Sequence, residues 1–148
     1  MSIEGIFEVG STAVLAGWLC LVFLPFWRGT QVIAAVLIPF LLGLAYTALI
    51  ASSIANPSGE PFSFESFGSI EGIRALFEAD AALVAGWFHY LAFDLFVGAW
   101  IVRDSRRHGI AHWWALPCLP FAFMFGPMGL VLYLLIRTIR LKTVEISA

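Results

Sequence analysis

Long apolar stretches separated by short polar turns dominate the hydropathy pattern of this chain. A membrane-spanning helix needs about 20 predominantly apolar residues. Four stretches meet that length: about residues 6–27, 31–54, 80–103 and 112–137. Because only helices and closed barrels can satisfy their backbone polar groups in lipid, stretches this long indicate helices. The pattern predicts an all-α integral membrane protein, with one transmembrane four-helix domain over residues 1–148.

The longest polar interruption lies between the second and third stretches. Residues 56–61 are rich in Pro, Ser and Gly, which end helices and form turns. The sequence that follows is acidic and contains several phenylalanines, so we expect residues 57–79 to lie at the membrane interface as a loop and a short helix. Ser66 or Ser69 can cap this helix, which we expect to continue through Asp80 into the third span.

Proline and glycine interrupt two of the predicted spans. Pro39 lies within the second span, where a proline removes a backbone hydrogen bond and kinks the helix. The run Phe-Gly-Pro-Met-Gly at residues 125–129 breaks the fourth span at mid-depth. This break is either a packing kink or a ligand-facing site, because irregular backbone at membrane depth must be covered by protein or line a cavity. Phe125 and Pro127 are therefore candidate substrate-binding residues.

Composition supports the membrane assignment and excludes several other classes. The chain is 61% hydrophobic and 12% charged, with a mean hydropathy of +0.92, whereas soluble domains carry about 25% charged residues. A net charge of -2 gives no reason to expect a nucleic-acid partner. The two cysteines form no CxxC or Cys/His cluster, so the sequence predicts neither a metal site nor a disulfide framework.

The basic residues do not decide the membrane orientation of a four-span protein. Lys and Arg are enriched in cytoplasmic loops. With four spans, one side carries Arg74, Arg137, Arg140 and Lys142, and the other carries Arg28, Arg103, Arg106 and Arg107. The count is tied, and the orientation stays open.

His89 and Asp94 are the histidine and the acidic residue that lie deep inside a predicted span, away from its ends. A charged group at membrane depth costs about 3 kcal/mol on insertion scales, so such residues indicate a functional site facing the bundle interior. On a helix the two side chains point about 140° apart and cannot contact each other. Trp87 shares the face of Asp94, and Tyr90 lies one turn before it, within hydrogen-bonding reach. We expect a cleft with one polar group on each side.

Each of these residues also has a purely structural interpretation. His89 can be a neutral imidazole bonded to a carbonyl, and Asp94 can be tied to Tyr46 or Tyr90. The polar turn from Arg103 to His108 can be a solvated segment against anionic headgroups. Alternatively, Arg103 or Asp104 folds over the bundle mouth and binds a polar substrate end.

Residues 89–96 (HYLAFDLF), Asp104, residues 117–119 and residues 125–129 together resemble the neoxanthin-synthase-like (abscisic-acid-deficient type) membrane proteins. That family has four predicted spans and a core motif that runs from a histidine to Asp-Leu-Phe. Its plant members are associated with the conversion of violaxanthin to neoxanthin. The resemblance implies a redox-neutral isomerisation of a carotenoid epoxide that needs an acid, a base and no cofactor.

By the same resemblance, the catalytic residues are His89 as base and Asp94, held protonated by burial, as acid, or the reverse. Substrate-binding roles are assigned to Trp87, Tyr90, Arg103, Asp104, Phe125 and Pro127. No organelle-targeting extension is present, so we expect a bacterial member in the inner membrane. The expected partners are a lipophilic polyene or other isoprenoid, membrane lipids, and further copies of the chain or a biosynthetic complex.

Two other functions fit the sequence. A non-catalytic membrane scaffold, or a pigment-binding or isoprenoid-binding subunit of a larger complex, needs no acid-base pair. A small proton pathway is the third interpretation, but His89 and Asp94 alone do not form a polar chain across the bilayer.

Overall fold

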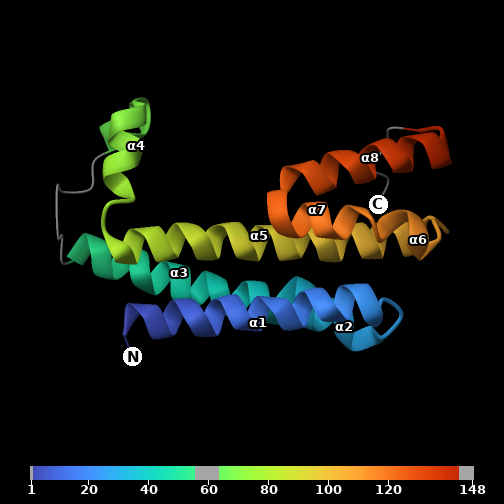
Figure 1. Cartoon of the computed structure of the whole chain (residues 1–148), viewed down its shortest axis with the longest axis horizontal. Coiled ribbons are helices and arrows are strands. Elements are labelled where there is room, and N and C mark those ends of the chain that lie inside the picture. The colour runs from blue at the N-terminus through green and yellow to red at the C-terminus, as the bar shows by residue number, and fades with distance from the viewer. Residues whose placement is uncertain (1, 56–63, 144–148) are drawn as a thin grey trace.

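The computed structural model describes residues 2–55 and 64–143, within which the regular elements are all helices (Figure 1). Three helical segments are long and apolar enough to cross a membrane. The first is α1 (Ile3–Phe23), the second joins α2 (Arg28–Val32), the π-helical turn η1 (Ile33–Leu37) and α3 (Ile38–Ala55), and the third is α5 (Asp80–Arg107). These segments confirm long apolar helices at three of the four predicted spans.

The three long segments pack into a bundle in which α1 runs parallel to α5 and α3 runs in the opposite direction (Figure 1). Leu95 of α5 is fully buried where the three helices meet. It lies against Gly17 of α1, and that glycine also neighbours Ile38 of α3. Most other side chains of α1 and α3 are exposed or only half-buried, as expected for helices that face lipid.

The predicted kink at Pro39 takes the form of the π-helical turn η1, which ends just before this proline. Proline has no N–H to donate and clashes with the carbonyl one turn earlier, so the preceding backbone widens from α to π. Gln31 helps to hold this segment, because its Nε2 donates to the carbonyl of Ala99 on α5 at 3.2 Å.

The interfacial segment contains a short 3-10 helix, η2 (Phe64–Gly68), and the helix α4 (Ile70–Leu76), which stands away from the bundle in Figure 1. Ser69 caps α4 as predicted, accepting a hydrogen bond from the Gly72 N–H at 3.0 Å. The predicted continuation into the third span is wrong, because α4 ends before Phe77 and α5 starts separately at Asp80. Residues 57–63 of the predicted loop lie outside the described residues.

The predicted fourth span over residues 112–137 is wrong. The segment forms three helices, α6 (His112–Ala115), α7 (Cys118–Phe125) and α8 (Pro127–Leu141), and α8 turns back along α7 (Figure 1). Gly126 makes the reversal with φ 43° and ψ −90°, a conformation that side chains with a Cβ rarely adopt. Pro127 then starts α8, where its missing N–H costs nothing.

The two arms of this hairpin lie in close contact. A Cβ at Gly129 of α8 would overlap the backbone nitrogen of Ala122 on α7, so only a glycine permits this approach. Small residues of this kind are what membrane helices use to pack closely. The tip of the hairpin, at Gly126, lies against Asp94 in the middle of α5. From there α8 runs back toward the carboxyl-terminal end of α5, where α6 and α7 began (Figure 1).

A buried ion pair holds the returning arm in place. Arg137 of α8 donates from Nε to Oδ2 of Asp104 on α5 at 2.9 Å, and the Tyr133 hydroxyl donates to the same oxygen at 2.6 Å. Arg137 is only 1% exposed and Asp104 only 6%. We refer to Asp104, Tyr133 and Arg137 as the Asp104 clamp. It places the carboxyl-terminal end of α8 beside the carboxyl-terminal end of α5.

Candidate functional site

The hairpin tip meets a buried carboxylate. Asp94 lies near the middle of α5 and is 6% exposed. Its Oδ1 approaches Gly126 so closely that a Cβ there would overlap it. Its Oδ2 has no hydrogen-bond partner among the described residues. A buried polar atom left unsatisfied costs about 1–3 kcal/mol, and such atoms in native proteins often serve a function.

The amino-terminal end of α8 lies beside the same carboxyl group. Gly126 precedes the first turn of this 15-residue helix, and Asp94 is in contact with Gly126. The amino-terminal end of a helix carries a partial positive charge that favours a nearby anion. Negative charge that develops on Asp94 when it gives up a proton is therefore stabilised by the helix that the Gly126 turn creates.

Tyr90 joins α5 to the first arm of the hairpin. Its hydroxyl donates to the carbonyl of Met124 at 2.8 Å, one of the carbonyls at the end of α7 that no helical N–H can reach. The Tyr90 side chain also interacts with Asp94. Trp87 stacks on the Tyr90 ring with centroids 5.5 Å apart, and its Nε1 donates to Ser11 of α1 at 3.2 Å.

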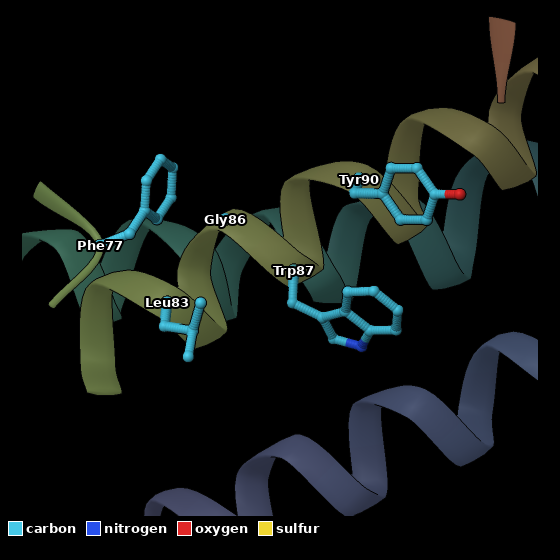
Figure 2. Close-up of a pocket in the computed structure, with 5 residues that line it drawn as sticks. All are labelled: Phe77, Leu83, Gly86, Trp87 and Tyr90. Atoms are coloured by element: carbon cyan, nitrogen blue, oxygen red, sulfur yellow. The ribbon is translucent and has the colours of Figure 1, made fainter. Parts of the chain in front are cut away.

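A groove leads along α5 to this cluster. It is lined by Phe77, Leu83, Gly86, Trp87 and Tyr90, and its volume is about 300 Å³ (Figure 2). Its walls are mainly apolar, and Figure 2 shows the Tyr90 hydroxyl at the end furthest from Phe77. The groove offers an aromatic, apolar surface that ends at Tyr90, and the Tyr90 side chain in turn interacts with the buried Asp94 carboxyl group behind it. This arrangement suits a long lipophilic molecule with a polar group at one end.

His89 lies apart from this cluster. Its ring is exposed on the outside of the bundle, 5.9 Å from the ring of Tyr46 on α3 and 4.7 Å from that of Phe93. The separation from Asp94 agrees with the angle predicted on the helix. Neither His89 nor Asp94 lines the groove itself, and only Asp94 is linked to it, through Tyr90, so the structure does not bring the two predicted catalytic residues to one cleft.

The other predicted substrate-binding residues divide between the two ends of the hairpin. Phe125 and Pro127 flank Gly126 at the tip, beside Asp94. Arg103 is exposed near the carboxyl-terminal end of α5, whereas the Asp104 carboxylate is buried and bonded to Tyr133 and Arg137 in the Asp104 clamp. No group of three or more His, Cys, Asp or Glu side chains that could hold a metal ion occurs among the described residues.

Sequence reasoning did not identify Gly126 and Met124 as parts of the site. The Phe-Gly-Pro-Met-Gly run indicated a helix break, but a break does not say whether the chain continues or reverses. The Met124 contribution is a backbone carbonyl, which any residue type supplies. The only sequence signal for it is its position just before the break.

Comparison with known proteins agrees with the resemblance noted from the motifs. Residues 5–133 match the profile of the ABA4-like family, described as ABA DEFICIENT 4-like. The matched region includes all but the first two residues of α1, and the whole of α3, α5, the hairpin tip and Tyr133 of the Asp104 clamp. No curated protein and no solved structure shows significant similarity to the chain.

Proposed function

We propose that this chain, which belongs to the ABA4-like family, is a membrane-embedded protein that modifies a carotenoid in a neoxanthin-synthase-like role. The observation that carries the proposal is the Asp94 carboxyl group, buried at mid-depth with one oxygen unpartnered. Ionisable groups kept at membrane depth usually have a function. The apolar groove that leads to Tyr90 supports a lipophilic substrate.

In this proposal the polyene lies along the groove. Its conjugated chain packs against Trp87 and Phe77, and its oxygenated ring reaches past Tyr90 to Asp94. Aromatic side chains suit a flat conjugated ligand because they offer large rigid apolar faces. Tyr90 is a positioning residue, since its hydrogen bond to Met124 holds the hairpin tip over the carboxyl group.

The reaction we propose is the isomerisation of a 5,6-epoxide to an allene and a tertiary alcohol. Protonated Asp94 donates from Oδ2 to the epoxide oxygen, and the bond from that oxygen to the ring carbon next to the polyene breaks. A base removes the proton from the adjacent polyene carbon, and that electron pair forms the second double bond of the allene. Substrate and product contain the same atoms, so the step consumes no oxidant or reductant.

Two assignments of the base are open to test. In the first, the Asp94 carboxylate accepts the carbon-bound proton after it has donated its own, which its link to the groove through Tyr90 supports. In the second, His89 is the base, as predicted from the sequence. His89→Ala leaves product formation unchanged under the first assignment and abolishes it under the second.

The test is pigment analysis of cells that make a carotenoid epoxide and express the protein. Asp94→Asn is expected to lower product formation at least about 100-fold, the usual contribution of a general acid or base. Asp80→Asn is the matched control, because it makes the same change at an exposed position of the same helix. Tyr90→Phe is expected to lower product formation less than Asp94→Asn, since it removes only the positioning contact.

A different result would favour a binding protein. If the purified protein retains an unaltered polyene, and Asp94→Asn changes neither the pigment profile nor pigment retention, the chain binds carotenoid without converting it. If it neither retains nor alters any polyene, the carotenoid proposal is wrong.

A further inference from the structure

We propose that the end of the molecule at which α5 and α8 finish is its cytoplasmic surface and binds anionic phospholipid headgroups there. We call this end the basic end. It comprises the start of α2, the last turns of α5, the turn between α5 and α6, helix α6 and the last turns of α8. The amino-terminal end of α1 and helix α4 then lie on the opposite side of the membrane.

The contacts within the structure place these segments together. Arg106 near the end of α5 donates to the carbonyl of Pro25, just before α2, at 2.8 Å. The Arg140 guanidinium of α8 lies 5.3 Å from the ring centre of Trp114 on α6. The Asp104 clamp joins α5 to α8 at the same level. Figure 1 shows α2, α6 and the end of α8 at one end of the molecule and α4 at the other.

This arrangement divides the basic residues unequally. All eight lysines and arginines lie within the described residues. Only Arg74, on α4, lies at the opposite end. The basic end carries the other seven: Arg28, Arg103, Arg106, Arg107, Arg137, Arg140 and Lys142.

The acidic residues show the reverse distribution. Asp104, whose carboxylate is buried in its clamp, is the acidic residue described at the basic end. Six others lie toward the opposite end: Glu4, Glu8, Glu65, Glu71, Glu78 and Asp80. The basic end therefore presents positive charge with little to neutralise it from the described part of the chain.

Several of these cations are available to a ligand. Arg28, Arg103, Arg107 and Lys142 are exposed, in contrast to Arg137, which is bound to Asp104. Trp113 at the start of α6 is 80% exposed, as is typical of a side chain in the headgroup layer. Exposed arginines at the same end of the molecule as an exposed tryptophan match the charge and position of lipid phosphate groups.

The positive-inside rule supplies the orientation. Short loops rich in Lys and Arg stay on the cytoplasmic side during membrane insertion. The tie expected from four spans disappears because the hairpin brings Arg137, Arg140 and Lys142 to the same side as the other four. The cytoplasmic leaflet carries anionic lipids, so the same residues that set the orientation also meet an attractive surface.

The orientation is tested by cysteine labelling of intact bacterial cells that express the full chain. Both native cysteines, Cys20 and Cys118, are replaced by alanine, and single cysteines are introduced as Gly68→Cys and Ala111→Cys. Both positions are exposed, and neither substitution changes a charge. A membrane-impermeant maleimide should label the Gly68→Cys variant in intact cells and the Ala111→Cys variant only after lysis. The reverse pattern, or equal labelling of both in intact cells, would overturn the proposal.

The lipid contact is tested separately, with purified protein in nanodiscs of phosphatidylglycerol or of phosphatidylcholine. Phosphatidylglycerol should raise the melting temperature, because a ligand that binds only the folded state stabilises it. The triple variant Arg103→Gln/Arg107→Gln/Lys142→Gln should lose this difference, and Arg74→Gln should keep it. High salt should reduce the difference in the unmodified protein, since exposed charges are screened. Equal melting temperatures in the two lipids, or an unchanged difference in the triple variant, would contradict lipid binding.

Discussion

Two residues far apart in the sequence, Asp94 and Gly126, form the contact between the middle of α5 and the tip of the hairpin. One carboxylate oxygen of Asp94 occupies the space that a Cβ of residue 126 would need. The φ of 43° at that residue independently disfavours any side chain. The glycine is thus required both for the reversal of the chain and for the approach of the hairpin to the carboxyl group.

Gly126→Ala is expected to lower the free energy of unfolding by about 1–3 kcal/mol, because the backbone strain adds to the overlap with Asp94. The measurement is thermal or denaturant unfolding in detergent. Gly43→Ala is the control, since a Cβ there meets no atom within 4 Å and a helical glycine is about 0.5–1 kcal/mol less favourable than alanine. Equal effects of the two substitutions would show that the tip is not packed as described.

Among the helices, α8 differs most from what its sequence predicts. It is apolar enough to belong to a span, yet its buried face carries Tyr133 and Arg137 rather than aliphatic side chains. Both bond to the Asp104 carboxylate, and His108 lies 3.4 Å from the other oxygen of that group. A polar attachment of this kind fixes the position of α8 along α5, whereas aliphatic packing alone tolerates sliding.

Arg137→Met is expected to destabilise the protein by about 3–5 kcal/mol, since it leaves a buried carboxylate without its cation. Arg140→Met is the matched control. Arg140 is exposed, and its guanidinium lies over the face of Trp114, a cation–π interaction of about 1 kcal/mol or less at the surface. The measurement is the melting temperature of each variant, which should fall much further for Arg137→Met than for Arg140→Met. Similar losses of stability in both would show that the clamp contributes little.

The double variant Asp104→Asn/Arg137→Met provides a second test of the clamp. Because it removes the buried charges together, it should be more stable than the sum of the two single changes predicts. Additive losses would indicate that the two residues act separately.

At the scale of the whole molecule, three long helical segments and one hairpin place the first and last described residues at opposite ends of the molecule (Figure 1). The groove lies on the half of α5 nearer to α4, away from the basic end. If the basic end is cytoplasmic, a lipophilic substrate reaches Tyr90 from the opposite leaflet, and Asp94 lies where the two leaflets meet.

Trypsin added to intact spheroplasts should cleave the protein only after Arg74. The other basic residues lie at the basic end, which we propose is cytoplasmic and which the protease therefore does not reach. Mass spectrometry of the fragments identifies the site, and the Arg74→Gln variant should resist cleavage. Release of peptides ending at Arg140 or Lys142 without membrane rupture would contradict the arrangement.

Much of the architecture could be predicted from hydropathy and local residue types. The three long helices, the Ser69 cap and the angular separation of His89 from Asp94 all follow from apolar length, capping chemistry and helical periodicity. These properties depend on residues close together in the chain. Only part of the candidate site could be predicted from the sequence. Asp94 and Tyr90 stand out as polar residues in an apolar run. The Met124 carbonyl and the Gly126 turn are backbone features, which residue type does not reveal.

The sequence by itself determined which segments leave water, since the cost of burying backbone and charge in lipid is a property of local composition. It did not determine the path of residues 112–137. A stretch of that length and hydropathy can cross the bilayer or turn back at a glycine, and both leave its backbone satisfied. Only the tertiary structure decided between them, because the reversal depends on what α5 presents: Asp94 at the tip and Asp104 for Tyr133 and Arg137.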